Sequence, residues 1–112
     1  MSTVWRIREA ATFAQLQRAG RRARRGPLTV RFLPLPSGSP QVAYAVSRRV
    51  GGAVVRNRVR RRLRHLVQEL VPTMPVGAYL IGASPAAATA ESPELRQALH
   101  AAVREASAGA QR

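Results

Sequence analysis

Residues 50–66, VGGAVVRNRVRRRLRHL, place six arginines and one asparagine in the nine positions from 56 to 64. Like charge at this density destabilises a segment through self-repulsion, so a negatively charged partner is the first hypothesis. Counted at ~100° per residue, the apolar residues of this segment and of the following turn share one arc of about 100°. These residues are Val59, Leu63, Leu66, Val67 and Leu70. The spacing predicts an amphipathic helix that begins near Ala53, ends before Pro72 and docks this arc on a core.

The opposite arc of the predicted helix is polar and strongly basic. It holds Asn57, Arg58, Arg61, Arg62, Arg64 and His65, with Arg60 at its boundary. The arc lacks the interleaved glutamates of a salt-bridged surface helix, so we interpret it as a polyanion-binding surface. Arginine side chains bind phosphate oxygens through two parallel hydrogen bonds and stack on exposed bases. Arginine on several sides of one helix favours recognition of backbone and shape, which suits folded RNA.

The charge of the 112-residue chain is unevenly distributed. Residues 1–64 hold 16 arginines and one glutamate, a net charge of +15, whereas residues 65–112 hold three arginines and four glutamates, a net charge of −1. Such polarity is typical of a polyanion-binding face. Cysteine is absent, which excludes disulfides. No apolar run approaches the ~18 residues of a membrane span, and the N-terminus lacks the apolar centre of a signal peptide. We therefore expect a soluble, cytoplasmic protein.

The remaining patterns predict one domain over residues 1–112, in the order helix, strand, strand, basic helix, strand, helix. A helix is expected at 8–19, and strands are expected at 28–34, 42–47 and 76–84. A last helix is expected to be capped by Ser92, and its apolar stripe consists of Leu95, Leu99, Ala102 and Val103. Residues 21–26, RRARRG, are interpreted as a basic connector, and residues 107–112 as a disordered tail. This order predicts a compact α/β sandwich.

The residue types argue against catalysis by this chain alone. Five scattered glutamates without aspartate offer no carboxylate pair for a metal-dependent nuclease. The two histidines, His65 and His100, have no metal-ligand partner at i+3 or i+4. We expect no catalytic residue and no metal site in the protein alone. The glycines Gly51 and Gly52 open the basic helix and could expose backbone N–H groups to a phosphate, although an ordinary turn also uses such residues.

Residues 45–64, AVSRRVGGAVVRNRVRRRLR, closely resemble the signature of the bacterial ribonuclease P protein subunit. In that family a strand ending in serine leads to a basic pair, a V-G-x-A-V loop and an R-N-R helix start. Here the serine is Ser47 and the loop is 50–54. The R-N-R positions are Arg56, Asn57 and Arg58. The resemblance extends over about residues 8–84.

The resemblance implies an α+β fold, an α/β sandwich of the ribosomal S5 domain 2-like type. One central mixed sheet has helices packed on it, and the basic helix forms a left-handed crossover between parallel strands. Topology rules alone predict a right-handed crossover. Ribonuclease P removes the 5′ leader from precursor tRNA, with the catalytic centre in a large RNA subunit. The resemblance implies an accessory subunit of this endoribonuclease that binds the RNA subunit and the leader and lowers the magnesium requirement. Magnesium would be bound by the RNA or at the protein–RNA junction, and neither a membrane nor DNA is an expected partner.

The resemblance also implies site residues. The expected contacts to the RNA subunit are Arg48, Arg49, Arg56, Asn57, Arg58, Arg60, Arg61 and Arg64. A leader cleft between the sheet and the first helix would include Phe13, Arg31, Ala45 and Ser47. This chain departs from the family pattern there, since Gln17 and Arg31 replace aromatic residues and Ala45 replaces a serine. Base stacking, worth ~1–3 kcal/mol per base, is therefore expected to be weaker, with arginine charge and stacking substituting for it.

Two other binding functions remain open from the residues themselves. A ribosomal-protein-like RNA binder would have a similar composition and no role in processing. A helix-inserting DNA-binding module would need a short turn into a recognition helix with asparagine or glutamine readers, and this helix offers one asparagine, Asn57, amid arginines.

Overall fold

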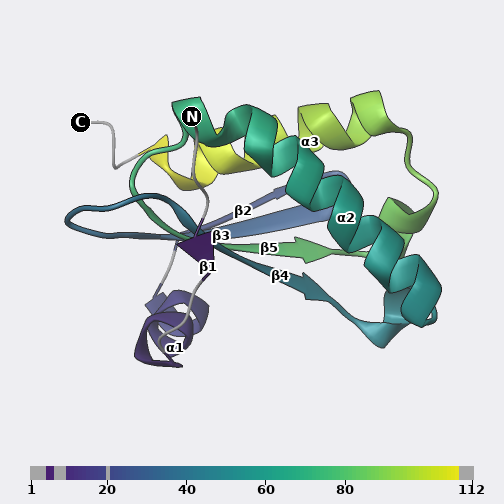
Figure 1. Ribbon diagram of the computed structural model, residues 1–112, viewed down its shortest axis with the longest axis horizontal. Helices are drawn as coiled ribbons and strands as arrows, with labels where there is room; N and C mark the ends of the chain where they lie inside the picture. The colour runs from purple at the N-terminus through teal and green to yellow at the C-terminus, as the bar shows by residue number, and fades with distance from the viewer. Residues whose placement is uncertain (1–4, 7–9, 20, 109–112) are drawn as a thin grey trace.

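The computed structural model describes residues 5–6, 10–19 and 21–108, and its strands form one mixed sheet (Figure 1). The strands are β1 (Trp5–Arg6), β2 (Arg21–Arg25), β3 (Leu28–Pro34), β4 (Gln41–Val46) and β5 (Gly77–Ala83). The helices are α1 (Ala10–Ala19), α2 (Ala53–Leu70) and α3 (Ser92–Ala106), with short 3₁₀ turns η1 (Arg48–Val50), η2 (Val71–Thr73) and η3 (Pro85–Ala88). The sheet order is β1-β4-β5-β3-β2. The β2–β3 and β3–β5 pairs are antiparallel, and the β1–β4 and β4–β5 pairs are parallel.

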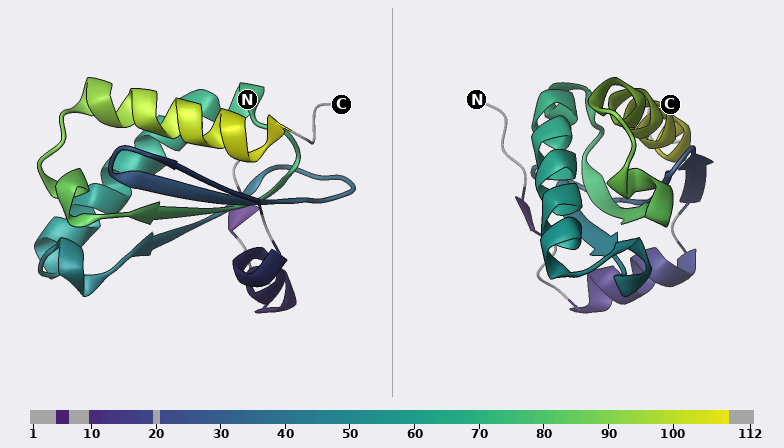
Figure 2. Two further views of the ribbon diagram at one scale, coloured as in Figure 1. Left: turned by 180° about the vertical axis from the view of Figure 1, so that it is seen from behind. Right: turned by 90° about the vertical axis from the view of Figure 1, so that its right-hand side faces the viewer.

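Helix α2 connects the parallel neighbours β4 and β5 by a left-handed crossover. In Figure 1 both strands point to the right, α2 lies in front of them, and the chain moves from the lower β4 to the upper β5. The side view in Figure 2 also places α2 on that side of the sheet. The α+β sandwich and this crossover confirm the fold class implied by the resemblance, against the right-handed rule.

The sheet separates two hydrophobic layers of different size. One face, here named the α2/α3 face, buries the larger core. Phe32 and Tyr79 meet there with ring centroids 4.9 Å apart, and they pack with side chains such as Val59, Leu63 and Leu99. The opposite face, here named the α1 face, carries a small cluster of buried Leu16, Ala78 and Leu80 with Phe13 and Leu33 packed beside it. Helix α1 covers only one end of its face (Figure 2).

The predicted apolar stripes are confirmed. On α2 the buried residues are Val59, Leu63, Leu66 and Val67, while Leu70 is half-buried. On α3 the buried residues are Leu95, Leu99, Ala102, Val103 and Ala106. Two ion pairs join α3 to its neighbours: Arg96 binds Glu69 of α2 through both carboxylate oxygens at 3.1 Å, and Arg25 of β2 binds Glu105.

The segment interpreted as a basic connector is a strand. β2 pairs with β3 along its whole length, and a turn at Gly26, with φ of 52°, joins the two strands. Only Ala23 of this strand is buried, and the four arginines around it are exposed. A single small apolar residue among charges gives too weak an alternation to indicate a strand, so the prediction was wrong. The pairing with β3 and burial of Ala23 under α3 stabilise it instead.

Two smaller predictions were also wrong, one about the start of α3 and one about the C-terminal tail. Helix α3 begins at Ser92, so its N-cap is Glu91 and not Ser92, and Glu91 makes no side-chain capping hydrogen bond. Ser107, expected in a disordered tail, is buried, and its hydroxyl donates to the Val103 carbonyl at 2.7 Å. Residues 109–112 of that tail, and residues 8 and 9 of the first predicted helix, lie outside the described residues. Within the described ranges, every helix is too short or too polar to cross a bilayer.

Candidate nucleic-acid interface

The start of α2 is an uncapped helix N-terminus. After β4 the chain passes through Ser47 and the 3₁₀ turn η1, whose Val50 is buried, and then through two glycines. A Cβ at Gly51 would lie 2.8 Å from the Cβ of Val55, so the close approach of loop and helix requires glycine there. Gly52 is the N-cap and has no side chain to accept hydrogen bonds from the first turn. The first backbone N–H groups therefore keep their partial positive charge available to a ligand.

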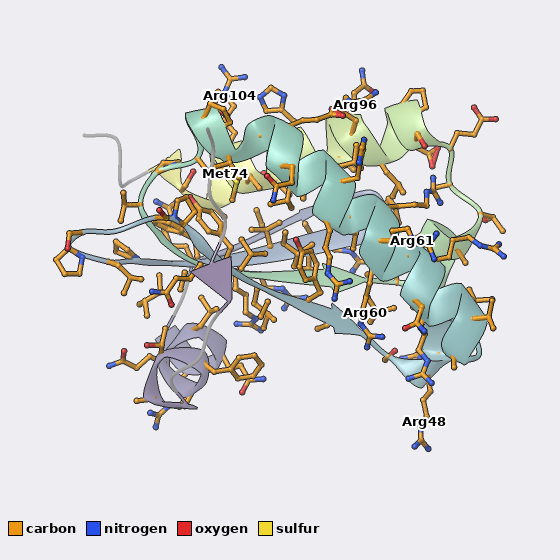
Figure 3. All side chains as sticks on the ribbon, viewed as in Figure 1. Arg48, Arg60, Arg61, Met74, Arg96 and Arg104 are labelled. Atoms are coloured by element: carbon orange, nitrogen blue, oxygen red, sulfur yellow. The ribbon has the colours of Figure 1, made fainter. Side chains whose placement is uncertain are left out.

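The predicted RNA-binding residues surround this N-terminus and continue along α2. Exposed members are Arg48, Arg49, Asn57, Arg58, Arg61 and Arg64, and half-buried members are Arg56 and Arg60. Figure 3 shows Arg48 projecting away from the body of the protein near the start of α2, with Arg60 and Arg61 further along the helix. The structure thus brings all eight onto one contiguous element, η1 plus α2.

Two of these side chains are oriented by neighbours. Arg60 donates through Nη1 to Oδ1 of Asn57 at 3.3 Å, one turn earlier on the helix. The Arg64 guanidinium lies 5.7 Å from the centroid of the Tyr44 ring, a cation–π distance. Burial raises the pKa of Tyr44 to about 12 although Arg64 lowers it, so the phenol stays neutral at physiological pH. These contacts hold Arg60 and Arg64 in place before any partner binds.

Arg62 differs from the other arginines of the run. It is half-buried and donates through Nη1 to the Ala87 carbonyl at 3.4 Å and through Nη2 to the Ala90 carbonyl. Both acceptors belong to the connection between β5 and α3, more than twenty residues later in the sequence. The helical pattern placed Arg62 on the accessible arc, and that expectation was wrong, because helical periodicity does not reveal which distant backbone covers one side of a helix.

Arg56 has a buried side-chain nitrogen without a partner in the described part of the chain. Its Nε has no hydrogen-bond acceptor, although the residue as a whole is half-buried. Leaving such a donor unsatisfied costs about 1–3 kcal/mol, more for a charged group. Sequence patterns give no signal for this feature.

The residues expected at the leader cleft lie on the α1 face. Phe13 packs beside Leu16 and Leu80, Arg31 is half-buried, and Ala45 and Ser47 are exposed. Arg31 donates through Nη1 to the Gln17 carbonyl of α1 at 3.1 Å, which ties the helix to β3. A positively charged group near the C-terminal end of a helix is favourable. Arg31 therefore serves as a link between α1 and the sheet.

The sheet register extends this face beyond the predicted residues. Ala45 of β4 pairs with Gly82 of β5, Gly82 with Thr29 of β3, and Thr29 with Arg24 of β2. We name Ala45, Gly82 and Thr29 the small-residue row. It lies on the part of the α1 face that α1 leaves open, and its three members are half-buried or exposed. Sequence patterns missed Thr29, Gly82 and Arg24 as surface neighbours because strand pairing is needed to align them.

Metal-ligating side chains do not gather in the described ranges. No group of three or more histidine, cysteine, aspartate or glutamate residues stands close enough to hold an ion there. His65 and His100 are both exposed, on α2 and α3.

Known structures share this fold. The RNase P protein of Staphylococcus aureus superposes with a TM-score of 0.81 at 18% identity, over 93% of this chain and 96% of that one. The RNase P protein of Thermotoga maritima superposes with a TM-score of 0.79 at 17% identity, over 89% of this chain and 96% of that one. At such low identity, these likenesses concern the fold alone.

Sequence relatives extend the match to the family. The ribonuclease P protein component of a Nocardioides species is 46% identical over 103 residues, which cover 88% of each chain. That of Thermobifida fusca is 44% identical over 108 residues, which cover 88% of this chain and 74% of the relative. The family model described as Ribonuclease P matches residues 1–107. The chain therefore belongs to the ribonuclease P protein family and is a protein component of that tRNA-processing endoribonuclease.

Proposed function

We propose that this chain binds the catalytic RNA subunit of ribonuclease P through η1 and α2, and the 5′ leader of precursor tRNA across the α1 face. The observation that carries the proposal is the exposed arginine set on α2, which extends from an uncapped helix N-terminus. From Ala53 to Gln68 the helix contains no acidic residue. Without internal counter-charge, this surface is most stable when an external polyanion occupies it.

The contacts expected on the RNA subunit are mainly to phosphates. Guanidinium groups bind phosphate oxygens bidentately, and the free N–H groups of the first turn of α2 add donors at the positive end of the helix dipole. The five exposed arginines of this set would make binding steeply dependent on salt. The Nε of Arg56 is buried and out of reach of an RNA oxygen in this conformation, so any contact of Arg56 with phosphate is made by its terminal guanidinium nitrogens.

The leader contacts on the α1 face combine one aromatic side chain with charge. Phe13 is half-buried and offers the remaining part of its ring to a base. Ser47 is exposed at the end of β4 and offers a hydroxyl donor, whereas Ala45 contributes only a small apolar contact. Arg31 is already engaged with Gln17, so its part is to hold α1 against the sheet and to supply positive charge.

The residues at the start of α2 do not fit a magnesium ion held by the protein. Magnesium prefers octahedral oxygen ligands, usually carboxylates or phosphates. The side chains there are arginines and Asn57, whose Oδ1 already accepts from Arg60. We propose that the magnesium ions of the reaction and the catalytic centre belong to the RNA. The protein lowers the magnesium requirement because its guanidinium groups neutralise phosphates that would otherwise need cations.

The test is cleavage of a precursor tRNA by a bacterial ribonuclease P RNA at low magnesium, with and without the protein. The wild-type chain should restore cleavage, and the variant with Arg56→Ala and Arg58→Ala should not. Because Arg56 is half-buried, a second variant with Arg58→Ala and Arg61→Ala removes only exposed side chains. Arg104→Ala on α3 serves as a control that leaves the proposed surface intact.

The outcomes separate two RNA-binding functions. If no form of the protein changes the cleavage rate while the wild type still binds RNA tightly, the ribosomal-type reading replaces this proposal. If the α2 variants restore cleavage as well as the wild type does, the assignment of the RNA contact to α2 is wrong.

A further inference from the structure

The edge strand β2 carries, on its α1 face, positive charge that has no ionic partner among the described residues. Arg25, which shares the α2/α3 face with Ala23, forms an ion pair with Glu105 of α3. Arg22 and Arg24 alternate with these residues and therefore belong to the α1 face. Both are exposed, and neither forms an ion pair within the described part of the chain. Arg21, on the same face as Arg25, is exposed and likewise has no ion pair in the described part of the chain, so the α1 face of β2 is distinguished by having neither of its arginines paired.

The register makes this unpaired charge costly. Arg22 lies directly opposite Arg31 of β3. Side chains in directly opposed positions have Cβ atoms about 4.5–5.5 Å apart, and like charges there destabilise a sheet. Arg31 has a carbonyl acceptor in Gln17, whereas no acceptor for Arg22 stands among the described side chains. The repulsion between the two opposed arginines is relieved when an anion binds to both of them.

Arg24 ends a continuous path across the sheet. The small-residue row runs from Ala45 of β4 through Gly82 of β5 to Thr29 of β3, and Arg24 of β2 is the direct neighbour of Thr29. Three strand spacings make this path about 14 Å long. Its members lack bulky side chains, and α1 covers the other end of the face (Figure 2). An extended polymer bound along this row would reach Arg22 and Arg24 of β2.

We propose that Arg22 and Arg24 bind phosphates of the single-stranded 5′ leader, beyond the part of the leader that lies beside α1. This inference rests on the proposed function and adds β2 to the leader-binding surface. A flexible polyanion fits the surface because the path is lined by small side chains that are exposed or half-buried and is basic at its end. Single strands are commonly bound by such basic tracks, with little dependence on sequence.

A simpler role for these arginines is protection of the sheet edge. β2 is the outermost strand, and charged side chains on edge strands prevent pairing with a second copy of the chain. This role predicts a change in oligomeric state after charge removal. It predicts no dependence on leader length.

The experiment compares precursor tRNAs with leaders of about 3 and about 12 nucleotides. Their affinities are measured for the holoenzyme that contains wild-type protein, the R22Q/R24Q variant, or the R21Q/R104Q control. The control removes the same charge from positions that belong to the α2/α3 side: Arg21 alternates with Arg22 on β2, and Arg104 projects from α3 (Figure 3). Size-exclusion chromatography and thermal unfolding of each free protein report self-association and folding.

R22Q/R24Q should weaken binding of the long leader about threefold to tenfold and leave the short leader unchanged. The slope of log K against log salt for the long leader should fall in magnitude by about 1.4, since each phosphate contact on a single strand contributes about 0.7. R21Q/R104Q should preserve the preference for the long leader. A charge-retaining R22K/R24K variant should recover most of it.

Other outcomes overturn the inference in distinguishable ways. If R22Q/R24Q weakens both substrates equally, the arginines do not act through the leader. If it self-associates while keeping the preference for the long leader, they protect the edge. If wild-type protein shows no preference for the long leader, the proposed leader binding is wrong, and this inference, which rests on it, is wrong as well.

Discussion

Arg62 of α2 donates to the backbone carbonyl of Ala90, and a second hydrogen bond from the same guanidinium reaches Ala87. This side chain therefore ties the basic helix to the segment that connects β5 with α3. Its neighbour Arg61 is exposed and forms no such bond. Two adjacent residues of the same type thus have different tasks, one inside the protein and one on its surface.

Arg62→Ala should lower the free energy of unfolding by about 1–3 kcal/mol, because charged hydrogen bonds to two partly buried carbonyls are lost. Arg61→Ala should change it by less than about 0.5 kcal/mol, as expected for an exposed side chain. Urea denaturation measures both. Affinity for the RNA subunit should show the reverse order, with the larger loss for Arg61→Ala. Equal effects of the two substitutions on stability would contradict the assignment of Arg62 to an internal role.

Gly51→Ala should destabilise the protein by about 1–3 kcal/mol. The new Cβ would lie 2.8 Å from the Cβ of Val55, and the backbone of the loop and of the helix fixes the positions of the two atoms. Gly52→Ala is the matched control, because a Cβ there meets no atom within 4 Å. Thermal unfolding of the two variants gives the comparison. If Gly51→Ala is the more stable variant, the close approach does not explain this glycine.

Gly52→Ser should raise stability and lower RNA affinity together. A serine at the N-cap accepts a hydrogen bond from the first turn of α2, which is worth about a few tenths of a kcal/mol relative to glycine. The same hydroxyl then occupies N–H groups that we propose to contact phosphate. Denaturation and RNA-binding titrations measure the two effects. A variant that is more stable and binds RNA as tightly as the wild type would show that these N–H groups do not contact the RNA.

Stability should fall between pH 10 and pH 12, partly because of Tyr79, whose pKa is also raised by burial, and partly because of Tyr44. Burial raises the pKa of the Tyr44 phenol from 10.0 in the unfolded chain to about 12 in the folded protein. The stabilisation is fully present below pH 10 and is lost as pH rises through 12, since the unfolded chain then releases its proton more readily. Tyr44→Phe removes this contribution. The variant should therefore lose less stability over this interval than the wild type, and parallel curves would contradict the assignment.

The sequence predicted most of the fold because the longest periodic segments are also the ones that form the core. The stripes of α2 and α3 and the strands at 28–34 and 76–84 follow directly from apolar spacing. Strand β2 was not predicted as a strand because its only buried side chain is Ala23. The arginine positions of the candidate site could be read from the motif, but the separation of Arg62 from Arg61 depends on backbone carbonyls supplied by a distant loop. Local patterns do not contain that information.

Arg31, which donates a hydrogen bond to the Gln17 carbonyl, stands where the family pattern has an aromatic residue, so leader binding by this chain should differ from that pattern. If charge and the positioning of α1 replace aromatic stacking, Arg31→Ala should lower the affinity for a precursor tRNA with a leader more than the affinity for a tRNA without one. Arg31→Lys should recover part of this loss. Phe13→Ala should also lower this affinity, by the ~1–3 kcal/mol of one base stack, if the exposed part of its ring contacts a base.

Both variants need a folding control, because Phe13 packs against Leu16 and Leu80 and Arg31 holds the end of α1. Phe13→Leu keeps the apolar packing and removes the aromatic face, so it separates stacking from stability. Affinities are compared for substrates with and without a leader, since a loss caused by general unfolding would affect both. If Arg31→Ala leaves leader affinity unchanged while Phe13→Leu lowers it, stacking carries the leader contact and the arginine contributes only to the attachment of α1.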